Sequence, residues 1–449
     1  MMRLKVSACL LLLAAGCAGP DPQVGHRPEN RDANAVPGAV PSPQVPETPI
    51  TIEEAISRAL SESARLDPYR AGLHIAREEK GAARDLEDPQ IRLAYGESTR
   101  TEDRGFETDQ ERRRRYRGVL RIYPPNPWVR NAVSHGGDAR IQLATANLRA
   151  AEHEIAVHVH WLFHEILQRR RERTLLEDIA KVRNDQFSQT EEILSRGAGT
   201  ASDVLMARID ALDARMDTEE ALRDEHRAMT DLATYLGFEQ GNEIKLAFPP
   251  IPLPGELDLA MLTTRAFEQR PDLAAVEWRA ETARWDLTAA RRISVPWFAH
   301  LQGAYTEERN GVDEDGWSVQ AAIDLPVFSV SGSDIGIATA ELEQFQAYAD
   351  QARAQVRLEV RQSLARLRLA RAELERYRQE TSPVLDQLNA DLASEVSTTL
   401  SPDDRADLRE GILKAERLRM ASDLAYERAW LELQIATASD WLIRPPGPE

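Results

Sequence analysis

Four histidines lie close together in the segment AEHEIAVHVHWLFHEI, residues 151–166. Imidazole nitrogens are common zinc ligands, and His160 and His164 are one helical turn apart, so this pair could bind a metal from one face of a helix. The His-Glu-x-x-His motif is absent, because the histidine that follows His153 and Glu154 comes five positions after His153 and lies off the face of the pair. We interpret the four side chains as structural or solvent-facing, with a role in metal export as the alternative, and expect no resident metal.

Other chemistry-bearing patterns are missing from the sequence. We find no Gly-x-Ser-x-Gly nucleophile, no phosphate-binding loop and no paired-cysteine zinc signature. We therefore expect no enzyme and no cofactor. The formal net charge of -18 argues against a nucleic-acid partner, since no basic stripe is available to displace counterions from phosphates. The acidity points weakly to cationic traffic, or only to solubility.

The amino terminus carries a short apolar run that ends in LLLAAGCAGP, residues 11–20. Basic residues precede the run and small residues close it, which is typical of a secretory signal peptide, and it is too short to span a bilayer. Residues 14–17, Ala-Ala-Gly-Cys, resemble a bacterial lipobox, in which Cys17 becomes the acylated first residue. The alternative is an ordinary signal peptide with an incidental cysteine. Because Cys9 is the only other cysteine, the mature chain forms no internal disulfide.

The rest of the chain is a duplication of one plan. Each half reads as helix, proline, helix, proline, strand, charged loop and strand, followed by a very long helical stretch. No apolar run outside the signal is long enough for a transmembrane helix, so any bilayer crossing must use strands. The predicted parts are a signal peptide (1–16), a lipidated Pro-rich tether (17–49), a first repeat (50–250), a second repeat (251–443) and a tail (444–449).

Long helices are the strongest physical signal in the sequence. Residues 138–196 contain no proline or glycine, and apolar residues recur three or four positions apart there and again after residue 333. Each long helix is followed by a turn and a return helix. The sequence therefore predicts two antiparallel coiled-coil hairpins, over about 138–236 and 333–442.

Four short segments alternate between apolar side chains and polar or small ones. They lie at about 91–100, 117–123, 297–306 and 317–325. Such alternation is typical of a transmembrane barrel strand with lipid on one face and water on the other, and the charged loops 97–115 and 306–316 would face water. An ordinary amphipathic sheet packed on helices explains the alternation equally well. Four strands cannot close a water-filled barrel, so several chains would have to contribute.

These features together resemble the TolC family of outer membrane efflux proteins. The resemblance rests on the duplicated order of elements, on IDLPVFS at 323–329, and on SRGAGTASDVLMARIDALDAR at 195–215. It covers about residues 50–443. The second hairpin turn, STTLSPDDRADLREG, and the proline-rich IYPPNPW at 122–128 depart from the family pattern, which bears on partner pairing and local geometry.

The resemblance implies a mainly α fold with a small β part. Three chains would form a twelve-stranded barrel in the outer membrane, continued into the periplasm by a helical tunnel and joined through a periplasmic adaptor to an inner-membrane pump. The chain would then be a passive conduit for efflux or type I secretion. The competing hypothesis is a lipid-anchored periplasmic coiled-coil scaffold without a pore.

The resemblance also gives candidate roles to residues at the two hairpin turns. Threefold symmetry would turn their carboxylates into acidic rings that favour cations. The alternative is that these carboxylates only stabilise helix N-termini and that the glycines only form turns. The candidate tip or gate residues are Asp203, Asp403, Asp404 and Asp407. The candidate adaptor-docking residues are Gly197, Gly199 and Leu205.

Overall fold

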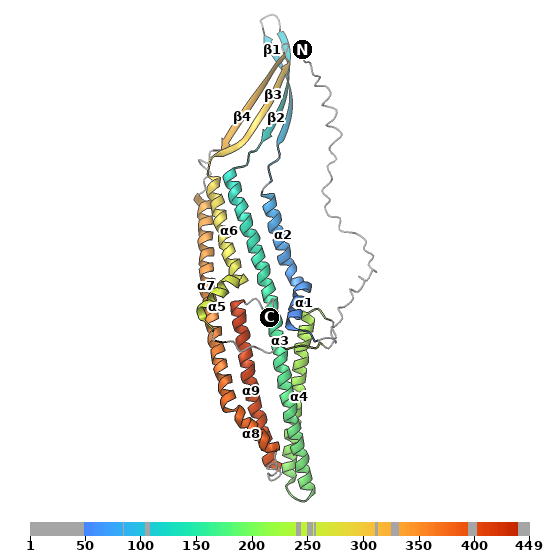
Figure 1. Cartoon of the computed structure of the whole chain (residues 1–449). Helices are drawn as coiled ribbons and strands as arrows, with labels where there is room; N and C mark the ends of the chain where they lie inside the picture. The colour runs from blue at the N-terminus through green and yellow to red at the C-terminus, as the bar shows by residue number, and fades with distance from the viewer. Residues whose placement is uncertain are drawn as a thin grey trace, which may run out of the picture. The chain divides into compact units, whose positions relative to one another are not determined.

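The computed structural model describes residues 49–83, 85–103, 108–238, 244–248, 255, 257–309, 313–324, 332–393 and 402–438. The signal peptide, Cys17 and most of the tether lie outside these residues. Both repeats are built from the elements that the sequence predicts, namely helices, a strand pair and a long helical hairpin (Figure 1). The chain is therefore mainly helical with a small β part, which confirms the predicted fold class.

The first repeat begins with a well-capped short helix. Thr51 accepts a hydrogen bond from the backbone N–H of Glu54, and the Glu54 side chain accepts one from the N–H of Thr51, so both ends of a capping box are present. The elements that follow alternate between short helices, strands and the long hairpin. They are α1 (Ile52–Glu62), a short 3-10 helix (Ala64–Leu66), α2 (Asp67–Ala82), β1 (Gln90–Asp103), β2 (Thr108–Ile122), α3 (Pro127–Ser195) and α4 (Ala201–Tyr235).

The second repeat follows the same order. Its elements are α5 (Leu259–Gln269), α6 (Pro271–Ile293), β3 (Trp297–Arg309), β4 (Asp313–Asp324), α7 (Gly332–Glu380), α8 (Ser382–Ala393) and α9 (Pro402–Thr437). α7 and α8 are separated at Thr381, where the sequence predicted no interruption. Pro383 explains the break, because proline has no N–H to continue the helical ladder.

Helix α3 starts 11 residues before the predicted Asp138. Asn126 caps it by accepting hydrogen bonds from Trp128 and Val129, and Pro127 occupies its first turn. The helix then runs through Gly136 and Gly137, which read as breakers in the sequence. Both glycines are buried, and a Cβ on Gly137 would lie 3.0 Å from Cγ of Lys80 in α2. The glycines therefore permit close packing of neighbouring helices.

The four strands form one antiparallel sheet in the order β1-β2-β3-β4. They extend further into the charged segments 97–115 and 306–316 than the sequence predicted, because charged side chains there pair across neighbouring strands. Arg114, for example, lies 3.8 Å from Glu97, and Arg115 lies 2.8 Å from Glu308. Among the described helices, none has a stretch both long and apolar enough to cross a bilayer.

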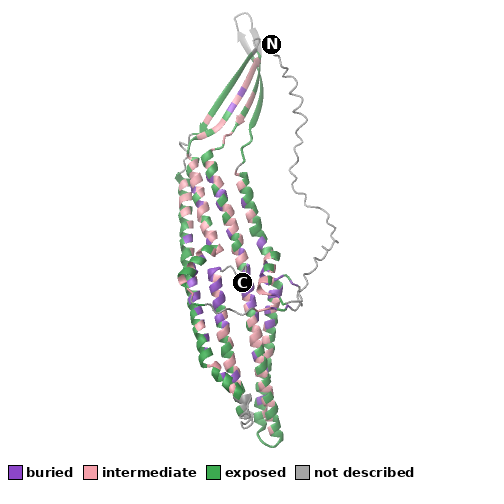
Figure 2. Ribbon diagram, viewed as in Figure 1, coloured by how far each residue is buried: buried purple, intermediate pink, exposed green. Residues whose placement is uncertain are grey.

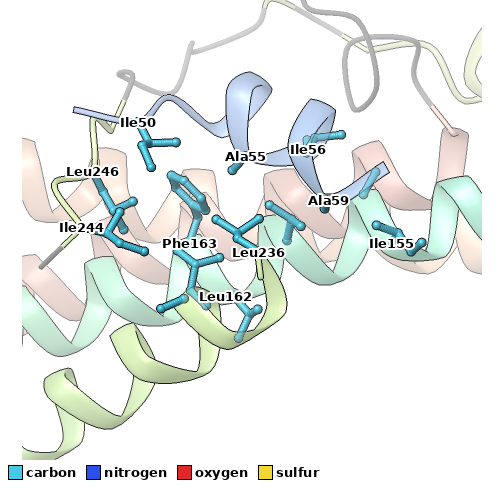
Figure 3. Close-up of a cluster of buried hydrophobic side chains, with 14 of the residues drawn as sticks. Ile50, Ala55, Ile56, Ala59, Ile155, Leu162, Phe163, Leu236, Ile244 and Leu246 are labelled. Atoms are coloured by element: carbon cyan, nitrogen blue, oxygen red, sulfur yellow. The ribbon is translucent and has the colours of Figure 1, made fainter. Parts of the chain in front are cut away.

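Each repeat has its own apolar core (Figure 2). In the first, α1 packs on α3 and the end of α4, and Phe163 and Leu236 lie between them (Figure 3). The chain near Ile50 adds a parallel bridge to Leu246, with the N–H of Ile50 donating to the carbonyl of Lys245 at 2.8 Å. In the second, α5 packs on α7 and α9 around Leu273, Val360 and Leu433.

Candidate functional site

One face of the sheet is a continuous apolar surface. Directly paired residues share a face, so the registers Leu93–Gly118, Gly118–Tyr305 and Tyr305–Trp317 place apolar or small groups in one row across all four strands. Trp317 and Val319 are 81% and 87% exposed, which is unusual for large apolar side chains. The exposed apolar residues of this face include Ile91, Leu93, Leu120, Ile122, Leu301, Trp317, Val319 and Ile323. A set of neighbouring exposed apolar side chains marks a surface that contacts a membrane or another protein.

Aromatic side chains bound this apolar face at both ends. At the loop end, Tyr95 lies 5.2 Å from Tyr116, and Tyr305 lies 4.8 Å from Trp317, measured between ring centroids. At the helix end, Phe298 pairs with Ile323 on the apolar face. Its ring lies 5.3 Å from that of Trp297, which contacts Trp128 edge-on at 5.2 Å and donates from Nε1 to the carbonyl of Pro124 at 2.9 Å. Aromatic girdles at both interfaces flank the apolar band of outer-membrane strands.

The opposite face of the sheet is polar. Arg121 donates from Nε and Nη2 to Oε1 of Gln302, at 3.1 and 2.8 Å, and Gln302 donates to Oε1 of Gln320 at 3.3 Å. Nearer the loop end, Glu308 accepts hydrogen bonds from Arg115 at 3.2 and 2.8 Å. The two faces therefore differ as the alternation in sequence predicts.

The turn between α3 and α4 is built by its glycines and by Asp203. Gly197 and Gly199 have φ angles of 82° and 84°, a conformation that favours glycine. Asp203 accepts from the N–H of Thr200 at 2.9 Å and completes a capping box at the start of α4. Asp203 thus has a structural part in this turn, whatever else it does.

An apolar stripe follows this turn along α4. Leu205 is 59% exposed, and Met206, Ile209, Leu212 and Met216 are exposed too. Because these apolar side chains are 45–66% exposed on one helix, the stripe is suited to contact with another helix.

The second turn carries the other candidate carboxylates. Asp404 and Asp407 are exposed at the start of α9, while the side chain of Asp403 lies outside the described residues. Close by, Arg183 of α3 lies 2.7 Å from Glu410 of α9 and 3.7 Å from Asp210 of α4. A hydrogen bond from Lys414 lowers the pKa of Glu410 against the effect of burial, and Arg183 adds to the lowering. The structure thus ties the two hairpins together near their turns.

Two glutamates farther up the hairpins have pKa values shifted in opposite directions. Burial alone would raise the pKa of Glu225 in α4, but hydrogen bonds from Arg173 and Arg170 of α3 hold the pKa below its usual range. Burial raises the pKa of Glu427 in α9, and Arg171 of α3 offsets that rise only in part. The first pair joins the arms of one hairpin, whereas the second joins the two hairpins.

The histidines are placed among packed helices. His160 is 6% exposed, and the ring of His158 lies tilted against that of Tyr235 with centroids 4.5 Å apart. Burial lowers the pKa of His153, and burial together with Arg428 and Arg171 lowers that of His164. Within the described parts of the chain, no group of three or more histidine, cysteine or acidic side chains is arranged to hold a metal ion.

Sequence reasoning identified the strands and the first turn but missed the Arg121–Gln302–Gln320 row and the Arg183–Glu410 contact. Both depend on which residues of distant segments lie side by side. The alternating polar positions of the strands were the only available signal for the first, and no signal in the sequence indicated the second.

Comparison with known proteins agrees with this geometry. Residues 55–238 match the family model described as outer membrane efflux protein, which confirms the resemblance seen in the sequence. No curated protein sequence matches the chain.

Several solved structures share the fold. CusC, crystallised in a study of transmembrane channel formation, has a TM-score of 0.66 at 16% identity, covering 88% of this chain and 99% of its own. The outer membrane protein VceC from Vibrio cholerae has a TM-score of 0.64 at 16% identity, covering 86% and 96%. The MtrE outer membrane channel of Neisseria gonorrhoeae has a TM-score of 0.63 at 15% identity, covering 89% and 91%.

Proposed function

We propose that this chain, whose residues 55–238 match the outer membrane efflux protein family, is the outer membrane channel of a tripartite efflux or type I secretion system. The observation that carries the proposal is the four-stranded sheet with one exposed apolar face bounded by aromatic residues and one polar face. Its strands of 12 to 15 residues exceed the roughly 9–11 needed to cross a bilayer. The apolar face then contacts lipid and the polar face lines water.

The sheet has two free edges. Among the described strands, β1 pairs only with β2 and β4 pairs only with β3. A spanning sheet must leave no backbone group unpaired in hydrocarbon, so β4 of one copy pairs with β1 of the next. Three copies give twelve strands, and the helical hairpins of the three copies continue the barrel into the periplasm. The assembly is a passive conduit and requires no catalytic residue.

The turns of the hairpins are the proposed contact with a periplasmic adaptor and, through it, an inner-membrane pump. The exposed stripe that begins at Leu205 supplies an apolar helix face for such contact. Asp203, Asp403, Asp404 and Asp407 would line the periplasmic entrance, with Gly197 and Gly199 shaping the first turn. Acylation of Cys17 would anchor each copy to the outer membrane in addition to its strands.

The decisive experiment measures the mass of the purified oligomer and its conductance in a planar bilayer. A trimer that conducts supports the proposal. A protein that inserts no conducting unit, whatever its mass, would be the lipid-anchored periplasmic scaffold instead. If the wild-type oligomer conducts, the Leu205→Asp variant should conduct equally well but should no longer crosslink to adaptor and pump in cells.

Lipidation is tested separately. Labelling cells with palmitate should mark the wild-type protein and leave a Cys17→Ala variant unmarked. Equal labelling of both proteins would refute Cys17 as the attachment site.

A further inference from the structure

Among its described side chains, the polar face of the sheet carries a charge opposite in sign to that of the whole chain. Alternate residues of a strand share a face, and the registers connect these sets across the sheet. Five arginines share the polar face with three carboxylates, counted among the described side chains. The arginines are Arg92, Arg113, Arg115, Arg117 and Arg121, and the carboxylates are Glu308, Glu314 and Asp324. Among these described side chains the face is therefore net positive, whereas the chain carries -18.

The arginines are neutralised unevenly along the strands. Towards the loops, Arg115 and Arg113 lie 2.8 and 3.9 Å from Glu308. Two rows nearer the helices than Arg117 on this face, Arg121 pairs with Gln302 and Gln302 pairs with Gln320, so neutral amides stand beside the arginine where carboxylates would cancel its charge. Among the described residues, neither Arg117 nor Arg121 forms an ion pair.

The amides hold the arginine in place without cancelling its charge. Both donors of Arg121 converge on one oxygen of Gln302, which is 7% exposed, and Gln302 is itself fixed by Gln320. In β1, Gln90 pairs with Arg121 across the strands and accepts a hydrogen bond from Arg92 at 3.4 Å. We name the residues Gln90, Arg92, Arg121, Gln302 and Gln320 the arginine–glutamine band.

We propose that the arginine–glutamine band makes the strand segment of the channel select for anions, so that the solutes which pass most readily carry negative charge. This inference rests on the proposed function, because three copies are needed to turn the band into a ring of six arginines and nine amides. Rings of arginine or lysine give anion preference in membrane pores, since the fixed charge attracts the counter-ion at close range. The preference is the opposite of the one that overall acidity and acidic tips would produce.

The test is the reversal potential of the reconstituted wild-type oligomer in a potassium chloride gradient. We expect chloride to be the more permeant ion. Arg121→Gln should lower the chloride-to-potassium permeability ratio by roughly threefold or more, because three charges are removed from one ring. Arg121→Lys, which keeps the charge and loses the planar fork, should retain most of the preference.

Arg114→Gln is the matched control. It removes the same charge from the same strand on the opposite face, where Arg114 lies 3.8 Å from Glu97, and should leave the ratio unchanged. Gln302→Glu serves as a second test that keeps every arginine, because a carboxylate beside Arg121 should also lower the ratio.

The outcomes separate this inference from the proposed function. A wild-type oligomer without conductance refutes both. A conducting oligomer whose ion preference is the same in wild type, Arg121→Gln and Gln302→Glu refutes the role of the band and leaves the conduit intact. If Arg114→Gln lowers the permeability ratio as much as Arg121→Gln does, the role of the arginine–glutamine band is also refuted, because the ratio would then depend only on total charge.

Discussion

Two glutamates that pair with arginines should lose very different amounts of stability on the same substitution. Glu225 receives hydrogen bonds from Arg170 and Arg173 at 3.0 and 2.6 Å, and its side chain is 12% exposed. Hydrogen bonds to charged groups contribute about 1.5–3 kcal/mol, against about 0.5–1.5 for neutral ones. Arg170 and Arg173 donate to different oxygens of Glu225, and in Glu225→Gln one of these oxygens becomes an NH2 group that cannot accept, so the α3–α4 hairpin should lose one charged hydrogen bond, about 2 kcal/mol.

Glu427→Gln should cost far less. Its carboxylate is 13% exposed, and Arg171 reaches both oxygens at 3.1 and 3.2 Å, yet burial still raises its pKa. The desolvation cost of the ionised carboxylate therefore exceeds the stabilisation that it gains from Arg171. Removing the charge cancels that cost, so the change in stability should lie within about 1 kcal/mol of zero.

Hydrogen–deuterium exchange is the suitable assay, because it reports on each hairpin separately. A loss of about 2 kcal/mol speeds exchange through local opening roughly 30-fold, so amides of residues 221–229 should exchange that much faster in Glu225→Gln. Amides of residues 423–431 in Glu427→Gln should stay within roughly fivefold of wild type. Unchanged protection in the first variant, or an equal acceleration in the second, would refute the reasoning.

The direction of pH dependence gives the same comparison an internal check. Because the folded-state pKa of Glu225 is lowered, its contribution is complete above the ordinary value of 4.5 and is lost as the pH falls through the folded-state pKa. Protection around residues 221–229 should therefore fall in that range in the wild type and change little in Glu225→Gln.

Four further outcomes are expected. Burial lowers the pKa values of His153 and His164 below 6.5, so the unfolded chain binds more protons than the folded chain. The thermal midpoint should therefore fall as the pH drops from about 7.5 to 5.5, and His164→Gln should reduce that fall. Gly137→Leu forces a side chain against Lys80 and should destabilise the α2–α3 contact by about 1–3 kcal/mol, measured by thermal melts. Gly72→Leu is the control, because nothing lies within 4 Å of the Cβ that it adds. Arg183→Gln breaks the contact with Glu410 and should weaken the tie between the two hairpins by about 1 kcal/mol, seen as roughly fivefold faster amide exchange around residues 183 and 410; unchanged exchange would contradict that tie. Calorimetry should detect no stoichiometric zinc binding at micromolar concentration, and binding that disappears in the double variant His160→Ala, His164→Ala would reverse our interpretation of the histidines.

Local periodicity was sufficient to predict most of the fold. Apolar residues recur three or four positions apart after Asp138, and apolar and polar residues alternate around Leu93 and Trp317. Both patterns lie within single segments, so helices and strands could be assigned without knowing their neighbours. The start of α3 could not, because Gly136 and Gly137 read as breakers until α2 and α6 are seen packed against them.

The candidate site was less predictable for a related reason. Which strand residues lie side by side depends on the register, and a shift of one residue would put Arg121 among the aliphatic side chains. The length of the strands at the loop end was underestimated, because charged residues such as Arg115 and Glu308 each read as part of a loop in the sequence. Only the folded sheet shows that they pair across strands. The sequence placed Asp203 correctly at a helix start. It could not distinguish a capping role from a role at the channel entrance, because an aspartate suits both.

The free edges of β1 and β4 also bear on inheritance. In the proposed trimer each sheet is completed by its neighbours, so one copy with a damaged edge would disrupt the whole ring. If normal and damaged copies are made in equal amounts and mix at random, only about one eighth of three-membered rings contain no damaged copy. Alleles that harm the β1 or β4 edge without preventing synthesis should therefore be dominant.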